Sequence, residues 1–114
     1  PDSEVKIIYL PSVSSSYKII SPLTSVTSDM GIPGIVNTRI LFQRHLEVCT
    51  EILKISQKLN ISFFDTTPYM RDASSIGYIH GPKDWSHLNE SGYRALSDSI
   101  SQFILHPDEP YQNC

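Results

Sequence analysis

Residues 37–65 read NTRILFQRHLEVCTEILKISQKLNISFFD, a helix-forming stretch that runs directly into a short apolar segment. Apolar residues recur in it at spacings of three, four or seven, and a second apolar stripe lies beside the first. The two sets are Leu41, Val48, Ile52, Ile55 and Leu59, and Phe42, Leu46, Cys49 and Leu53. The pattern predicts a helix over residues 37–59 that packs a wide apolar face against a sheet, with Asn60 in the left-handed position after it.

Two short apolar segments enclose this helix. Residues 5–10 are rich in β-branched side chains and stop at Pro11, and residues 61–65 follow the helix directly. Strand, helix and strand in this order predict a βαβ unit with parallel strands and a right-handed crossover. Both segments are nearly continuous in apolarity, as in strands buried on both faces. Two strands and two or three helices cannot bury such a pair, so we expect the rest of the sheet to come from elsewhere.

The remaining segments carry weaker signals. Residues 21–34 are rich in Ser, Thr, Pro and Gly without either period, which predicts a long loop insertion that is either functional, such as a lid, or mobile. Residues 69–87 are predicted to be irregular. Asn89 is a good N-cap for a last helix that ends before Pro107. The predicted buried face of that helix comprises Tyr93, Leu96, Ile100, Phe103 and Ile104.

The composition indicates one soluble globular domain of 114 residues, with 39% hydrophobic and 18% charged residues. The net charge of −3 provides no basic face for nucleic acid, and no apolar run approaches the length of a membrane span. The chain opens on Pro1 without a secretory leader, so we expect a trimmed or mature form, or a part cut from something longer. The two cysteines do not make a disulfide framework, and Cys49 is predicted to be a small core residue.

Asp84 and His87 stand three residues apart just before the last helix. A serine hydrolase needs an imidazole that takes a proton from the nucleophile, and a carboxylate that holds the other ring nitrogen as a donor. An Asp-x-x-His turn can supply both groups from one loop, because the turn brings the carboxylate back toward the ring. The plainer interpretation is a surface turn that caps the helix.

Other polar residues admit similar pairs of interpretations. His80 with Asp84 and His87 offers three zinc ligands without regular spacing, which is a weak metal signal, and His80 alone fits a loop histidine near the mouth of a site. Trp85 either lines an acyl pocket or anchors the loop. Ser12, Ser14, Ser15 and Ser16 form a turn, or one of them supplies a substitute nucleophile. Arg71 and Asp72 reach the substrate or form a surface ion pair. His45 and His106 are structural or solvated.

The block Asp84-Trp85-Ser86-His87-Leu88-Asn89, followed by Gly92-Tyr93 and an apolar helix, resembles the closing catalytic block of SGNH (GDSL-type) serine hydrolases. The preceding helix, the strand at residues 61–65 and the opening strand at residues 5–10 are similar in order and length to the second half of that family. The resemblance implies an α/β, three-layer flavodoxin-like fold, of which this chain supplies the C-terminal βαβα part. Residues 1–114 are then a single domain or the C-terminal portion of one, with the insertion at residues 21–34.

The family's Gly-Asp-Ser nucleophile block and its oxyanion-hole Gly and Asn have no counterpart in the sequence. The resemblance therefore implies an esterase, a lipase-like enzyme or a carbohydrate O-acetyl esterase or acyltransferase, with His87 as general base and then acid and Asp84 as its orienting carboxylate. The Ser would lie on an N-terminal companion segment. The expected substrate is a small ester or an acylated glycan or lipid, and neither a cofactor nor a metal is needed.

Two alternatives remain open. The first is a non-catalytic binding or assembly module derived from a truncated hydrolase fold, which predicts a stable lone chain or a homodimer. The second is a metal-binding domain that uses His80, Asp84 and His87, which predicts a stoichiometric metal. The sequence alone leaves the compartment and the substrate undetermined.

Overall fold

The computed structural model describes residues 3–27, 30–111 and 113–114. Its elements, in chain order, are β1 (Lys6–Tyr9), the short 3-10 helix η1 (Ser14–Ser16), β2 (Leu23–Thr27), β3 (Pro33–Asn37), α1 (Thr38–Lys58), β4 (Ser62–Asp65), α2 (Thr67–Ser74) and α3 (Glu90–Leu105). The chain is thus a mixed α/β domain with helices and small sheets.

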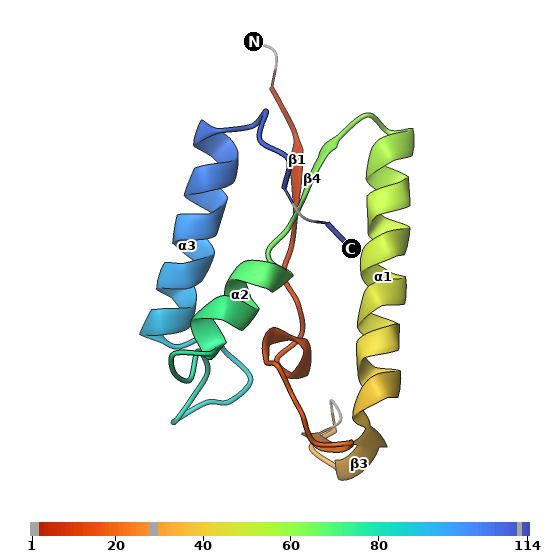
Figure 1. The fold of residues 1–114 in the computed structure, drawn as a ribbon, viewed down its shortest axis with the longest axis vertical. Coiled ribbons are helices and arrows are strands. Elements are labelled where there is room, and N and C mark those ends of the chain that lie inside the picture. The colour runs from red at the N-terminus through yellow and green to blue at the C-terminus, as the bar shows by residue number, and fades with distance from the viewer. Residues whose placement is uncertain (1–2, 28–29, 112) are drawn as a thin grey trace.

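The centre of the molecule is a pair of parallel strands, β1 and β4, in which Ile7 lies opposite Phe63 and Tyr9 opposite Asp65. Figure 1 shows α1 on one side of this pair and α2 and α3 on the other. The prediction of two parallel strands joined by a long helix is confirmed. In the part of the chain that the structure describes, the sheet holds these two strands alone, so β1 and β4 each keep one unpaired edge.

Three asparagines define the helix ends as local chemistry predicts. The Asn37 side chain accepts a hydrogen bond from the Arg39 N–H at 2.9 Å and begins α1. Asn60 follows α1 with a φ of 51°, the left-handed conformation that asparagine tolerates. The Asn89 side chain accepts from the Gly92 N–H at 3.0 Å and begins α3.

The prediction of a long loop at residues 21–34 is wrong for half of its length, which is strand. Residues 23–27 and 33–37 form the antiparallel strands β2 and β3, with Thr24 opposite Val36 and Val26 opposite Gly34. Residues 28 and 29 of that predicted loop lie outside the described part of the chain. The serines and threonines suggested a loop, but Thr and Val favour extended backbone, and alternate residues of β2 are half-buried.

The irregular stretch predicted at residues 69–87 begins with a helix, since α2 covers residues 67–74 with Pro68 in its first turn.

The wide apolar face predicted for α1 is only partly buried. Val48 and Ile55 are about half exposed, whereas Cys49 and Ser56 are buried. A sheet of two strands is too narrow to cover that face, so the contact falls on the stripe around Cys49.

The core is a stack of aromatic rings around Phe64. Phe64 lies parallel to Phe103 of α3, with ring centroids 4.6 Å apart, and Tyr111 meets both rings edge-on. The Tyr111 hydroxyl donates to the Gln102 and His106 carbonyls, which holds the chain after α3 against the sheet. This end of the chain then passes in front of β4 toward α1 (Figure 1).

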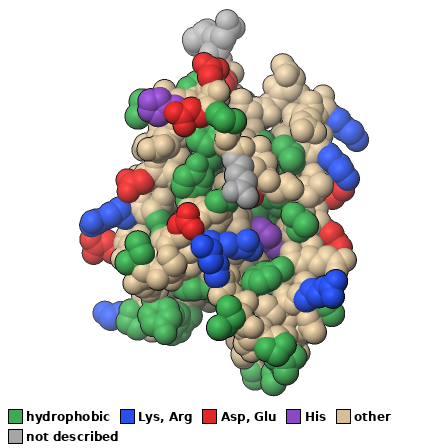
Figure 2. Space-filling view, viewed as in Figure 1, with side chains coloured by type: hydrophobic (Ala, Val, Ile, Leu, Met, Phe, Trp, Pro, Cys, Tyr) green, Lys and Arg blue, Asp and Glu red, His purple; other side chains and the backbone are tan. Residues whose placement is uncertain are grey.

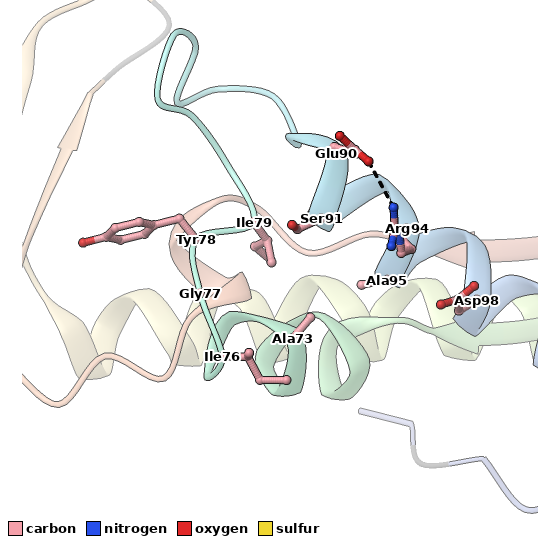
Figure 3. A pocket seen from close by; sticks show the side chains of 10 residues that line it. All are labelled: Ala73, Ile76, Gly77, Tyr78, Ile79, Glu90, Ser91, Arg94, Ala95 and Asp98. Atoms are coloured by element: carbon pink, nitrogen blue, oxygen red, sulfur yellow. Dashed lines mark hydrogen bonds and ion pairs between the residues drawn. The ribbon is translucent and has the colours of Figure 1, made fainter.

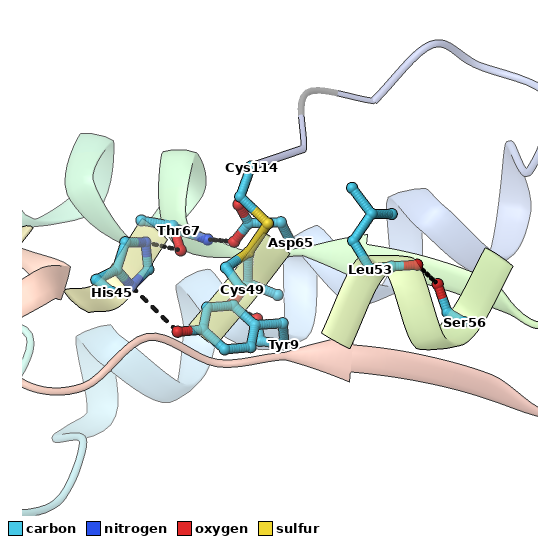
Figure 4. Close-up of a disulfide and its surroundings, with 9 residues drawn as sticks. Tyr9, His45, Cys49, Leu53, Ser56, Asp65, Thr67 and Cys114 are labelled. Carbon is cyan, nitrogen blue, oxygen red and sulfur yellow. Dashed lines mark hydrogen bonds between the residues drawn. A yellow bond between two sulfur atoms is a disulfide. The ribbon is translucent and has the colours of Figure 1, made fainter. Parts of the chain in front are cut away.

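A disulfide between Cys49 of α1 and Cys114 closes this arrangement (Figure 4). The prediction that Cys49 is a core residue is confirmed, since it is fully buried. The cysteine count predicted no disulfide framework, and it did not indicate the single bond that joins the two cysteines. The bond joins residues 65 positions apart whose Cα atoms lie 5.9 Å from each other. The fold-back of the chain after α3 creates this proximity, and no sequence spacing reveals it.

Large hydrophobic side chains remain on the surface (Figure 2). On and beside β1, Val5, Leu10, Val48 and Tyr93 are 45–62% exposed. In the described residues, no helix has both the length and the apolarity to cross a membrane.

Candidate active site

The structure joins Asp84 and His87 by a hydrogen bond, with Asp84 Oδ2 2.5 Å from His87 Nδ1. The other carboxylate oxygen, Oδ1, accepts from the Ser86 N–H at 2.8 Å. The His87 hydrogen bond, and secondarily the Ser86 N–H, hold the pKa of Asp84 below its ordinary value. Asp84 is therefore an ionised acceptor at neutral pH, and His87 Nδ1 carries the proton. This leaves Nε2 of His87 as the nitrogen available for proton transfer.

Asn89 holds the loop that carries this pair. Beyond capping α3, its Nδ2 donates to the Tyr78 carbonyl at 2.8 Å and to the His80 carbonyl at 3.3 Å, and its N–H donates to the Ile79 carbonyl at 2.9 Å. The sequence indicated the cap, but the ties to the start of the loop depend on the fold. Both ends of the loop are thus fixed to the first turn of α3.

Gly92 allows the loop to approach α3 closely. A Cβ at this position would lie 2.2 Å from the Ile79 carbonyl oxygen and 2.8 Å from Leu88 Cδ2. Only a glycine leaves room for the Ile79 carbonyl to reach the Asn89 N–H. The Gly-Tyr that follows the Asp-x-x-His block therefore has a packing role in placing the loop.

His87 lines a cavity of about 380 Å³ at the C-terminal end of β1. Apolar side chains from the end of β1 and from α3 form most of its wall, and Ser12, His80, Ser86 and Tyr93 supply the polar groups. The remaining lining residues are Leu10, Pro11, Val13, Leu88 and Leu96. The C-terminal edge of parallel strands is where ligands bind in open α/β sheets.

Of the four serines predicted as turn residues or substitute nucleophiles, Ser12 is the one that lines this cavity. Its Oγ donates to Ser15 Oγ at 3.1 Å. Ser15 and Ser16 are buried, and the Arg71 Nε donates to the Ser15 carbonyl at 2.9 Å. Arg71 therefore secures this turn, and Asp72 forms an exposed ion pair with Lys18.

His80 is the site residue that the sequence placed least well. It is 4% exposed and lines the same cavity as His87. Its Nδ1 lies 3.1 Å from the hydroxyl of Tyr17, and burial lowers its pKa. No local pattern shows this, because Tyr17 is 63 residues away in the chain.

The other predicted residues are placed outside this cavity. Trp85 is half exposed and meets Tyr78 edge-on, which fits the loop-anchor interpretation. His45 Nδ1 lies 3.1 Å from the Tyr9 hydroxyl on the α1 side of the sheet, a structural role. His106 is exposed at the end of α3.

A larger cavity, of about 540 Å³, lies between α2 and α3 (Figure 3). Its polar groups include the Glu90–Arg94 ion pair and Asp98, and the side chain of Tyr78 points away from α3. It contains neither histidine nor cysteine. Since its lining offers no imidazole or thiol, the cavity that His87 lines is the better candidate for a catalytic site.

The structure does not bring His80, Asp84 and His87 together as a metal site. Within residues 3–27, 30–111 and 113–114, the one cluster of three metal-ligating side chains is Cys49, Asp65 and Cys114. Its two sulfur atoms are joined in the disulfide, and Asp65 Oδ1 accepts from the Thr67 N–H at 2.9 Å (Figure 4). Without thiolates, this cluster is a covalent crosslink beside a helix start.

No protein-family model matches the chain, and comparisons with curated proteins and with solved structures return no match. The functional argument therefore rests on the residues of this chain.

Proposed function

We propose that this chain is the C-terminal part of an SGNH-like serine hydrolase that acts on ester bonds. The observation that carries the proposal is the Asp84–His87 hydrogen bond at the C-terminal edge of β1. It fixes one ring nitrogen of His87 as a donor and leaves the other free to accept a proton, which is the arrangement that a nucleophilic serine needs.

In this mechanism, His87 Nε2 takes the proton of a serine hydroxyl as the serine oxygen attacks the ester carbonyl. The resulting imidazolium then gives that proton to the departing alkoxide, and an acyl-enzyme remains. Water, or a second alcohol in an acyl transfer, repeats the sequence and releases the acyl group. Asp84 stabilises the imidazolium throughout, and no metal or cofactor takes part.

The serine and the oxyanion hole are proposed to lie on an N-terminal companion segment. The unpaired edge of β1 supports this, because a parallel strand flanked by helices is normally paired on both sides. Exposed Leu10 and Tyr93 on one side of the strand, and Val48 on the other, are apolar surface that a completed sheet would cover. The two cavities at this end of β1 are lined by these residues.

Native mass spectrometry of the purified protein, followed by the same measurement under denaturing conditions, tests this assembly. A second polypeptide that carries a Gly-Asp-Ser supports the proposal. A folded 12.9 kDa chain or homo-oligomer without esterase activity contradicts it and favours the non-catalytic module.

Hydrolysis of 4-nitrophenyl acetate by the complete protein tests the chemistry. His87→Ala should abolish hydrolysis, whereas His106→Ala, at an exposed position outside the cavity, should leave the rate unchanged. Equal rates for the His87→Ala variant and the unmodified protein would exclude His87 as the base.

A further inference from the structure

His80 is held at a fixed position beside His87. Its backbone pairs with Leu88 in an isolated antiparallel β-bridge, and its carbonyl accepts from Asn89 Nδ2 at 3.3 Å. Leu88 is the neighbour of His87 in the chain, and both histidines line the 380 Å³ cavity. The cavity therefore contains a second imidazole that the triad chemistry does not use.

The hydrogen bonds of Tyr17 determine the tautomer of His80. The Tyr17 oxygen accepts from the Ile79 N–H at 3.2 Å and lies 3.1 Å from His80 Nδ1. If Nδ1 carried a proton, the Tyr17 oxygen would accept twice, and its own proton would have no acceptor in the described residues. The arrangement that gives every proton an acceptor among the described residues has Tyr17 donate to Nδ1, which favours the tautomer with the ring proton of His80 on Nε2. Burial keeps the ring neutral by lowering its pKa.

His80 Nε2 is not completely buried. Nε2 forms no hydrogen bond with the residues that the structure describes. Every fully buried side-chain nitrogen or oxygen among those residues has a hydrogen-bond partner, so Nε2 is not one of the fully buried atoms. Nε2 is therefore not sealed in the core, and the space that His80 borders is the cavity of His87. A donor of this kind, in a wall with many apolar side chains, is a specific polar contact for a ligand.

We propose that His80 Nε2–H donates a hydrogen bond to the alcohol half of the substrate ester, and selects an alcohol with a further oxygen beside the esterified one, as in a partly acylated sugar. The inference rests on the proposed function, because it takes the ester bond to lie at His87. In the proposed mechanism His87 protonates the departing alkoxide, which places the alcohol half next to His87, in the cavity that His80 also lines. An alcohol without the second oxygen would leave the His80 donor unpaired, which a polar site of this kind disfavours.

Two acetate esters of equal heavy-atom number test the selectivity. For the complete protein, kcat/KM should be about tenfold higher for 2-hydroxyethyl acetate than for propyl acetate. His80→Asn, whose amide lies near the Nδ1 position, should remove the preference. His80→Gln, whose amide reaches the Nε2 position, should restore it in part. A purely structural role for His80 would lower both rates and leave their ratio unchanged.

The outcomes separate this inference from the proposed function. Hydrolysis of both esters with equal kcat/KM, or a preference that survives His80→Asn, overturns the role of His80 and leaves the triad proposal standing. Hydrolysis of neither ester overturns both.

A measurement on the 114-residue chain itself tests the tautomer without any activity. Two-bond ¹H–¹⁵N correlation spectra should show His80 with a protonated Nε2 and an unprotonated Nδ1 at pH 7. Tyr17→Phe should change that pattern, because the donor to Nδ1 is lost. A spectrum with the proton on Nδ1 in the unmodified chain would overturn the inference.

Discussion

Nδ1 of His87 lies 2.5 Å from Oδ2 of Asp84, and the two residues stand in one turn that the Ser86 N–H also closes. The carboxylate is exposed, its Oδ1 closes the turn by accepting from the Ser86 N–H, and its one ion pair in the described residues is with His87. A turn that served only to cap α3 would not need the Asp84 carboxylate, because Asn89 already caps that helix. The Oδ2–Nδ1 contact is therefore the part of this turn that the proposed orienting role of Asp84 would use.

Replacing Asp84 with Asn should reduce esterase activity of the complete protein roughly 10³–10⁴-fold, because the amide no longer selects the tautomer with Nδ1 protonated. The loss should appear in kcat, with KM little changed. Steady-state kinetics with 4-nitrophenyl acetate provide the measurement. Asp72→Asn, in an exposed ion pair with Lys18, is the matched control and should keep full activity. A loss in Asp84→Asn that is no larger than in the control would refute the orienting role.

Gly92→Ala should destabilise the domain by about 1–3 kcal/mol, since the new Cβ would overlap the Ile79 carbonyl and either the loop or α3 must move. Gly77→Ala is the matched control, because a Cβ there has no neighbour within 4 Å and the expected change is within about 0.5 kcal/mol. Urea denaturation of both variants measures the difference. The close approach would be discounted if the two glycines tolerated alanine equally.

The Asp84–His87 turn and the Gly92 contact show which structural features of this chain local sequence predicts and which it does not. The cap at Asn89, the left-handed Asn60 and the Asp84–His87 contact depend on residues a few positions apart, and each was predicted from the sequence. The cap at Asn37 is equally local, although the sequence analysis predicted only a helix that starts at this residue. The role of Gly92 depends on Ile79, 13 residues earlier, and no local pattern indicates it.

The features that sequence patterns missed depend on contacts between distant residues. The contact of His80 with Tyr17 joins residues 63 positions apart, and the Cys49–Cys114 bond requires the chain after α3 to fold back onto α1. The β2–β3 hairpin was missed for a different reason, because its Ser and Thr residues also suit loops. The half-exposed face of α1 follows from a sheet of only two strands.

Reduction of the Cys49–Cys114 disulfide should lower the free energy of unfolding by about 4 kcal/mol, because the bond closes a loop of 65 residues in the unfolded chain. Cys114→Ser should have a similar effect without reductant. Thermal unfolding with and without dithiothreitol measures the change. In the Cys114→Ser variant the reductant should have no further effect. A thiol titration that finds two free cysteines in the unreduced, denatured chain would contradict the bond itself.

Stability should fall as the pH drops from about 7 to 5.5. Burial lowers the pKa of both His45 and His80, with Arg71 adding to the effect at His45 and Asp65 opposing it. Below the unfolded pKa of about 6.5, the unfolded chain binds more protons than the folded one, so protonation favours unfolding. His80 faces Tyr17 and, across the cavity, His87, and neither residue supplies an anionic partner for an imidazolium.

Urea denaturation at pH 7 and 5.5 measures this loss. His80→Gln should reduce the difference between the two pH values, and His106→Gln, at an exposed site, should preserve it. A stability that rises over the same interval would reverse the sign and rule out neutral, buried imidazoles.

Labelling of the complete protein with a fluorophosphonate, which reacts with activated serines, tests whether Asp84 and His87 complete a serine triad. One serine should be labelled, located by peptide mass spectrometry outside these 114 residues, and the label should be lost in His87→Ala. An unlabelled protein, a label on Ser12, or labelling that persists in His87→Ala would contradict a triad completed by Asp84 and His87.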